Sequence, residues 1–401
     1  MIKSSSTVSL AILIPATLML LCTSCGYGSR KLIPESRRDS LAVEKVLASM
    51  TLREKVGQMF IVRLEALDPT YSNAEVRDIS SPGLLSIEKG VVIFNRDYPV
   101  GGISLYAKNI RNPEQLLKLT DAIHTQLLYD PLVCVDEEGG RVARLANIDS
   151  LNLKRFESTR AIAGRNRPRD AFKAAKYIGT YLKKYGFDVT FAPVADVSTN
   201  PRDTVIGSRT FSGDPDVAAK FVVQYLKGLA RSGIAGCLKH YPGQGNAARD
   251  THFSIDYIRK SWEELEECEI RTFRAGIAAG APLIMTAHLI ASEIDTTVWR
   301  RRKVPVSLSK YMLEGKLRGD LGFDGLIVSD GLDMRSIVSL FPSRYSALMA
   351  IDAGTDLILL PYDFRRAFES VVSAVENGEI SEERIDRSVR KILLLKRGIR
   401  S

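Results

Sequence analysis

The sequence predicts an α/β fold, a (β/α)8 TIM-type barrel formed by a single domain, and three observations lead to it. Eight short apolar runs rich in β-branched residues recur along the chain, as expected of parallel strands buried on both faces. Longer amphipathic stretches separate these runs and can serve as crossover helices. Polar side chains gather directly after the runs. The eight runs are Met59–Val62, Gly102–Tyr106, Leu132–Val135, Val189–Val194, Ile234–Leu238, Leu283–Thr286, Leu326–Val328 and Asp356–Leu360.

Helix starts between the runs carry capping residues. An Asn or Asp before a proline places a side-chain cap ahead of the first helical position, and Ser followed three residues later by Glu forms a capping box. These starts are Asn112-Pro113, Asp214-Pro215 and Ser261 with Glu264, and the last two helices should end near Gly233 and Gly280. The alternative is a doubly wound sheet, but the count of eight strands favours the barrel.

The polar residues that follow the runs define a candidate site. In a barrel, the carboxyl ends of all strands meet at one mouth, which is where such folds keep their chemistry. We therefore expect the following side chains to converge: Asp136, Asp196, Asn200, Arg209, Lys239, His240, His288 and Asp330.

The N-terminal segment is predicted to be a processing signal. Lys3 precedes a short apolar run, Val8 to Leu21, which is too short for a comfortable membrane span of about 20 residues. Small residues before Cys25 are typical of a bacterial lipoprotein cleavage site, although Cys22 stands where Leu is usual. We expect residues 1–24 to be a lipoprotein signal peptide, Cys25 to carry the lipid, 25–40 to be a flexible tether and 41–401 to fold.

Composition narrows the possible partners and compartment. The net charge of +9 suits an anionic partner such as cell wall or a membrane surface, and without a long Lys/Arg run nucleic acid is not expected. Cys134, Cys237 and Cys268 are odd in number and widely spaced, which does not fit a disulfide framework. Cys134 and Cys237 fall in apolar runs, where we expect buried free thiols. The prediction is an exported, lipid-anchored protein of the bacterial cell envelope, a monomer that needs no cofactor and no metal.

Four separated motifs then point to a family. They are Val135-Asp136-Glu137-Glu138-Gly139-Gly140-Arg141-Val142-Ala143-Arg144, Ile206-Gly207-Ser208-Arg209-Thr210-Phe211, Lys239-His240-Tyr241-Pro242-Gly243-Gln244-Gly245 with Asp250-Thr251-His252, and Val328-Ser329-Asp330-Gly331-Leu332-Asp333-Met334. In this order they resemble family 3 glycoside hydrolases, over nearly all of residues 41–401. The Asp-x-His pair resembles the β-N-acetylglucosaminidase (β-hexosaminidase) branch, whose members use one barrel without a C-terminal sandwich domain.

The resemblance implies a role for each polar residue. Asp330 would be the nucleophile of a retaining hydrolase, and His252, held by Asp250, would be its acid/base. The implied sugar-binding set is Asp136, Arg144, Arg209, Lys239 and His240. The loop departs from the family pattern at Gln244, where His is common and where Gln cannot titrate. The substrate would be an oligosaccharide with terminal β-linked N-acetylglucosamine, whether peptidoglycan fragment, chitin oligomer or glycan.

Several alternatives stay open from the sequence. Asp330 could cap the next helix, although Asp333 is better placed for that, and Asp250 could cap a turn. Asp196 is as well suited to capping a loop as to touching substrate, and His288 fits a supporting or core position. At the level of function, the alternatives are a metal-dependent hydrolase, a lipoprotein that binds cell-wall sugar without cutting it, and a β-glucosidase or phosphorylase of the same family.

Overall fold

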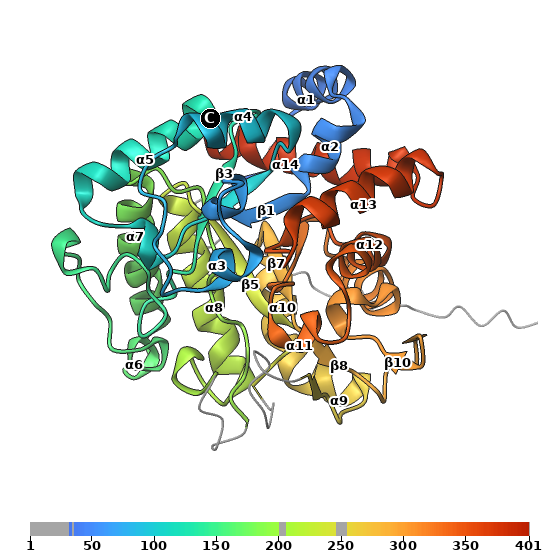
Figure 1. Cartoon of the computed structure of the whole chain (residues 1–401). Coiled ribbons are helices and arrows are strands. Elements are labelled where there is room, and N and C mark those ends of the chain that lie inside the picture. The colour runs from blue at the N-terminus through green and yellow to red at the C-terminus, as the bar shows by residue number, and fades with distance from the viewer. Residues whose placement is uncertain (1–31, 34–35, 200–205, 246–254, 401) are drawn as a thin grey trace, which may run out of the picture.

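The computed structural model describes residues 32–33, 36–199, 206–245 and 255–400, and they form a barrel of parallel strands surrounded by helices (Figure 1). Each strand overlaps a predicted run, so the predicted fold is confirmed. The barrel strands are β1 (Phe60–Arg63), β2 (Gly102–Ser104), β3 (Leu132–Val135), β4 (Val189–Thr190), β5 (Ala235–Tyr241), β7 (Leu283–Thr286), β11 (Leu326–Ser329) and β12 (Ile358–Leu359).

The strand order excludes a doubly wound sheet. The hydrogen-bonded order is β11-β7-β5-β4-β3-β2-β1-β12, so the first strand pairs with the last, with Phe60 opposite Ile358. A parallel bridge between Val328 and Leu357 joins β11 to the segment that leads into β12 and closes the ring. In an open sheet, β11 and β12 would be edge strands and would not pair with each other.

Strand β4 is shorter than its predicted run. The regular ladder ends at Thr190, because the N–H of Ala192 turns back to the Thr190 carbonyl at 2.8 Å and Pro193 has no N–H to donate. Val194 then pairs with Lys239 as an isolated bridge. The chain therefore leaves the barrel wall close to the mouth, where Asp196 follows.

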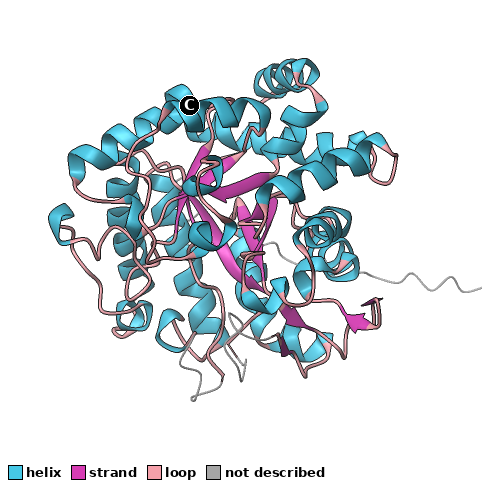
Figure 2. Cartoon of the chain, viewed as in Figure 1, coloured by secondary structure: helices cyan, strands magenta, loops and turns pink. Residues whose placement is uncertain are grey.

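Helices cover the outside of the barrel (Figure 2). The crossovers between successive strands are α4 (Lys89–Asp97), α5 (Pro113–Gln126), α7 (Pro168–Lys184), α8 (Pro215–Arg231), α9 (Trp262–Glu267) with α10 (Glu269–Ala278), η6 (Tyr311–Asp320) and α12 (Ser343–Ala353). Helices α1 (Arg37–Ser49) and α2 (Leu52–Gln58) precede β1, and α13 (Phe364–Glu376) and α14 (Glu382–Arg400) follow β12. The remaining short elements are η1 (Leu64–Leu67), α3 (Asn73–Arg77), η2 (Ala107–Asn109), η3 (Asp149–Leu151), α6 (Thr159–Ala163), η4 (Gly207–Arg209), β6 (Asp256–Tyr257), β8 (Leu289–Ile290), β9 (Val298–Trp299), β10 (Arg302–Lys303), η5 (Val306–Leu308) and α11 (Arg335–Val338).

The predicted helix caps are present. Asn112 accepts the backbone N–H of Gln115 at 2.9 Å, Asp214 caps α8, and Ser261 forms the capping box with Glu264. One expectation was wrong: the helix predicted from Ser261 to Gly280 is two helices, because Cys268 takes non-helical backbone angles of φ −130° and ψ −87°.

Part of the segment predicted as a tether belongs to the described structure, where Leu32 is buried in the core. Ser36 caps α1 by accepting the N–H of Asp39, so residues 37–40 are helical, and an ion pair joins Asp39 to Arg397 of α14. The predicted signal peptide and Cys25 lie outside the described residues. None of the helices in the described ranges combines the length and apolar character that a membrane span requires.

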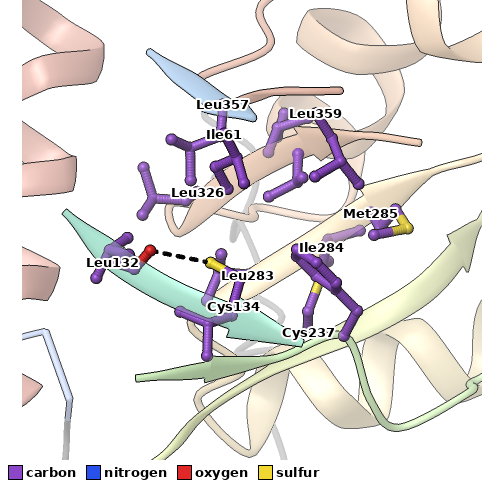
Figure 3. Packing of buried hydrophobic residues seen from close by; sticks show 14 of the residues in the cluster. Ile61, Leu132, Cys134, Cys237, Leu283, Ile284, Met285, Leu326, Leu357 and Leu359 are labelled. Atoms are coloured by element: carbon purple, nitrogen blue, oxygen red, sulfur yellow. Dashed lines mark hydrogen bonds between the residues drawn. The ribbon is translucent and has the colours of Figure 1, made fainter. Parts of the chain in front are cut away.

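The barrel interior is filled by apolar side chains from different strands (Figure 3). Ile61, Leu132, Leu283 and Leu326 are fully buried, and the two thiols of Cys134 and Cys237 lie among them. Burial raises the pKa of both thiols above its usual range, which keeps them neutral. They are free cysteines, as predicted.

Candidate active site

The carboxyl ends of the strands surround a cavity of about 380 Å³. Asp330 and all five predicted sugar-binding residues line it. Of the eight side chains expected to converge, five line the cavity, whereas Asp196 and His288 do not. The lining residues are Arg63, Ile79, Tyr106, Asp136, Val142, Arg144, Phe191, Arg209, Lys239, His240, Gln244, Met285, Asp330, Gly331, Asp333, Met334, Leu359 and Leu360. The other two predicted catalytic residues, Asp250 and His252, lie outside the described residues, as does Asn200.

Asp330 follows β11 directly and is held by the barrel backbone. Its own N–H donates to the Thr286 carbonyl of β7 at 3.0 Å, and its Oδ1 accepts the N–H of Gly331 at 2.7 Å. The first bond extends the ladder between β11 and β7 by one residue. The carboxylate therefore stands on the rigid end of a strand and not on a free loop.

His288 supports the backbone beside Asp330. The side chain is 1% exposed, with Nε2 3.0 Å from the Gly331 carbonyl and Nδ1 2.7 Å from Oγ of Ser307. A carbonyl only accepts, so Nε2 carries the proton, and Nδ1 is left to accept from the serine hydroxyl. This is the supporting position that the sequence offered as one reading of His288.

Neither Asp330 nor Asp333 caps a helix. The next helix, α11, begins at Arg335, and its N-cap is Met334 without a side-chain bond. Asp333, the better placed of the two for capping, instead pairs its carboxylate with the guanidinium of Arg63 at the end of β1, 2.8 Å from Nη2. Both side chains are about nine-tenths buried.

Tyr106 provides a platform for two arginines. The Cζ of Arg63 lies 4.0 Å from the centre of the Tyr106 ring, and that of Arg144 lies 5.4 Å from it. Nη1 of Arg63 and Nε of Arg144 are buried without a hydrogen-bond acceptor among the described residues. Because both arginines line the cavity, these two N–H groups are candidate donors to a bound ligand.

Lys239 joins two acidic side chains of the segment that follows β3. Its Nζ lies 2.9 Å from Oδ1 of Asp136 and 2.6 Å from Oε1 of Glu138. Arg209 forms a bidentate ion pair with Glu138, in which Nε and Nη2 donate to the carboxylate at 2.8 Å and 2.7 Å. Four of the charged side chains at the mouth thus form one network.

The network keeps both acids ionised. Burial alone raises the pKa of Asp136, but the charges of Lys239 and Arg144 lower it well below its usual range. Burial likewise opposes ionisation of Glu138, yet Arg209 and Lys239 lower its pKa to about 2. Asp136 therefore faces the cavity as a full acceptor at neutral pH.

Sequence reasoning missed Glu138. An extended chain points alternate side chains the same way, so residues 136 and 138 share a side while Glu137 points away. Glu137 does lie on the other side, where it accepts the hydroxyl of Tyr181 at 2.6 Å and the N–H of Leu145 at 2.8 Å. That alternation was available in the sequence and could have identified Glu138.

Asp196 supports the loop that carries His240. Its Oδ2 lies 2.8 Å from Nδ1 of His240, and its Oδ1 accepts the N–H groups of His240 at 3.2 Å and Gln244 at 2.7 Å. Asp196 is 1% exposed and does not line the cavity. Of the two roles that the sequence left open, the structure favours holding the loop.

The cavity wall alternates cationic donors with carboxylate acceptors. Such a wall suits an uncharged ligand with many hydroxyl groups, since each hydroxyl both donates and accepts. Within the described ranges, no three His, Cys, Asp or Glu side chains gather as potential metal ligands.

Comparison with known proteins also points to a carbohydrate ligand. Residues 51–395 match the glycosyl hydrolase family 3 N terminal domain. The Beta-hexosaminidase of Pseudomonas aeruginosa is 34% identical over 285 residues, which cover 70% of this chain and 81% of that protein. Beta-hexosaminidase A of Pseudoalteromonas piscicida is 30% identical over 319 residues, 75% of this chain and 53% of that protein. This chain therefore spans about half the length of the second relative.

Solved structures show the same fold. A family 3 β-N-acetylglucosaminidase from Paenibacillus sp. superposes with a TM-score of 0.78 at 31% identity, over 88% of this chain and 63% of that one. A family 3 glycosyl hydrolase from Mycobacterium smegmatis superposes with a TM-score of 0.68 at 25% identity, over 87% of this chain and 98% of that one.

Proposed function

Because the chain belongs to glycoside hydrolase family 3, we propose that it is a retaining glycosidase that releases terminal β-linked N-acetylglucosamine, with Asp330 as nucleophile. The observation that carries the proposal is the position of Asp330. It stands at the rigid end of β11 and shares a cavity of about 380 Å³ with cationic and carboxylate side chains, which can hydrogen-bond to hydroxyl groups. The names of the relatives, β-hexosaminidase and β-N-acetylglucosaminidase, support the choice of sugar.

The proposed reaction proceeds in two displacements. The Asp330 carboxylate attacks the anomeric carbon while an acid protonates the leaving oxygen, which gives a glycosyl ester on Asp330. Water then attacks the same carbon, with the former acid acting as base, and the sugar leaves with its configuration retained. We assign the acid/base to His252, because imidazole exchanges protons near neutral pH, and its orientation to Asp250.

The network around Asp136 is assigned to recognition of the sugar. Because Lys239 and Arg144 keep Asp136 ionised, its two oxygens can accept from neighbouring hydroxyls. His240 and the buried N–H groups of Arg63 and Arg144 are assigned as further contacts. Arg209 spends two of its nitrogens on Glu138, so its main role in this proposal is to hold that wall in shape.

The direct test is release of p-nitrophenol from its β-N-acetylglucosaminide by the full chain. Asp330→Asn should lower kcat by more than about 10³-fold. Asp324→Asn makes the same chemical change on the surface, where the side chain is 95% exposed, and should leave the rate unchanged. If Asp330→Asn keeps wild-type activity, the nucleophile has been misassigned.

The same assay separates the other candidate functions. A panel of aryl glycosides distinguishes a glucosidase, and a rate that rises with added phosphate, with sugar phosphate as product, identifies a phosphorylase. Activity that survives a strong chelator removes metal-dependent hydrolysis. A protein that binds N-acetylglucosamine oligomers but turns over none of the glycosides is a sugar-binding protein and not an enzyme.

For the cell, we propose an exported monomer anchored in the envelope by a lipid on Cys25, acting on cell-wall or other oligosaccharides without a cofactor. The N-terminal sequence and the net charge of +9 support this assignment. Metabolic labelling with a fatty acid should mark the wild type and not Cys25→Ala, and the variant should move from the membrane to the soluble fraction. An unlabelled wild type would remove the anchor.

A further inference from the structure

Nearly all of the net positive charge of the chain lies in one short segment. Residues 154–184 contain ten Lys and Arg and two Asp and Glu, a net charge of +8, whereas the whole chain carries +9. All ten cationic residues are exposed. They are spaced along a loop, α6 and α7 and so form no run, but the fold gathers them on one flank of the barrel.

Part of this segment forms a groove outside the catalytic cavity. A hollow of about 560 Å³ lies between residues 154–158, α6 and the first half of α7. Five cations and two acidic residues, Glu157 and Asp170, line it. Arg155 pairs with Asp149, and Arg167 pairs with Asp170. The other three, Lys154, Arg165 and Lys173, have no ion pair with any residue that the structure describes, so their charges are available to a ligand.

Two aromatic rings form the apolar part of the groove. Phe156 and Tyr177 pack edge to face, with ring centres 6.2 Å apart, and Nζ of Lys154 lies 5.2 Å from the centre of the Phe156 ring. The Tyr177 hydroxyl accepts the N–H of Lys154 at 2.9 Å, which fixes the loop against α7. Aromatic surface beside fixed cations suits a ligand with both apolar ring faces and negative charges.

The groove adjoins the wall of the catalytic cavity. Thr159 of α6 donates to the Gly139 carbonyl at 3.2 Å, in the segment that carries Glu138. Arg160 of α6 donates to Oγ1 of Thr210 at 2.7 Å, directly after the η4 residue Arg209. A polymer lying in the groove would therefore run beside the backbone that shapes the cavity.

We propose that this groove binds an anionic polysaccharide, a sugar chain with carboxylate or phosphate groups along it, at a site separate from the catalytic cavity. This proposal rests on the proposed function only in taking the ligand to be a sugar polymer. The cations without an ion-pair partner among the described residues favour a negatively charged ligand. The concave shape favours a chain over a flat bilayer, which would touch the rim and leave the aromatic rings uncovered.

The test measures binding of the full chain to three polymers with one backbone: carboxymethyl dextran, phosphorylated dextran and unmodified dextran. The groove variant is Arg165→Glu with Lys173→Glu. The control is Lys45→Glu with Lys89→Glu, which changes the net charge equally at exposed positions on α1 and α4. Vesicles of phosphatidylglycerol and phosphatidylcholine test a membrane as the alternative surface.

The wild type and the control should bind a charged dextran, more weakly as salt rises, and bind unmodified dextran far less. The groove variant should bind the charged dextran about tenfold more weakly or worse, a loss of about 1.4 kcal/mol. The charged dextran that binds better shows whether the groove prefers carboxylate or phosphate groups. Equal losses in both variants, equal binding of the neutral polymer, or binding to vesicles alone overturns the proposal. Cleavage of the aryl glycoside by the groove variant should stay at the wild-type rate, so the outcome is independent of the proposed function.

Discussion

Asp196 and His240 form a buried pair in which the carboxylate Oδ2 lies 2.8 Å from the imidazole Nδ1. Because an ionised carboxylate only accepts, Nδ1 carries a proton, and Nε2 is the ring nitrogen left for the cavity that His240 lines. The other oxygen of Asp196 holds two backbone N–H groups of the same loop. One side chain thus fixes both the loop and the imidazole tautomer.

Asp196→Asn should therefore impair the site without touching substrate. The amide can donate to Nδ1 and favour the opposite tautomer, and we expect kcat/KM to fall roughly ten- to hundredfold. Nitrogen NMR of labelled His240 should show the proton moving from Nδ1 to Nε2, a change that mere loosening of the fold would not cause. Unchanged imidazole shifts in an impaired variant would contradict the tautomer argument.

Glu138→Gln should destabilise the protein. The change removes the charge between Arg209 and Lys239, and breaking a buried charged network costs about 3–5 kcal/mol. Because the folded pKa of Glu138 is lowered to about 2, its stabilisation is present above the ordinary value of 4.5 and is lost as pH falls towards 2. Urea unfolding at a series of pH values should show wild type and variant converging over that window.

The matched control for this change is Glu114→Gln. Glu114 pairs with Lys118 on the surface of α5, with both side chains more than three-quarters exposed. Its loss should change the free energy of unfolding by less than about 0.5 kcal/mol. A similar cost for both variants would show that burial of the Glu138 network is not what stabilises the barrel mouth.

His124, on α5, should make stability depend on pH near neutrality. Burial lowers the pKa of His124. Asp130, at 2.7 Å, together with Asp188 and the Gly186 carbonyl, has the larger opposite effect. The pKa of His124 is therefore raised, even though Arg400 lies nearby. A raised pKa gives stabilisation that is complete below the unfolded value of about 6.5 and is lost as pH rises through the folded value.

His124→Gln should accordingly be less stable than the wild type at pH 5.5, by about 1 kcal/mol, and closer to it at pH 8.5. Thermal melts across this range provide the measurement. A constant difference in Tm between the two proteins would mean that the protonated imidazole contributes nothing.

His252→Ala should slow cleavage in proportion to how much the leaving group needs a proton. With a sugar leaving group, kcat should fall about 10²–10⁴-fold. A 2,4-dinitrophenyl glycoside should recover most of the lost rate, because that leaving group departs without protonation. Equal losses with both substrates would assign His252 to another role.

The sequence predicted most of the fold because the signals for its elements are local. A strand buried on both faces appears as a continuous apolar run, and a helix start is marked by a capping residue. It failed where the deciding contact lies far along the chain. Asp333 looked like a helix cap, but its partner Arg63 lies 270 residues away. Glu138 had no visible role without Arg209, 71 residues away. Six of the predicted site residues line the cavity, because their positions follow from strand ends and from family motifs.

The pairing of β11 with the segment that leads into β12 has a consequence for synthesis of the protein. Strand β11, which Asp330 follows, has only β7 as a neighbour until residues 356–359 leave the ribosome. A chain stalled before that point carries Asp330 at the end of an exposed strand edge, which is the kind of surface that aggregates or recruits chaperones. The barrel can therefore close only after residues 356–359 have been synthesised.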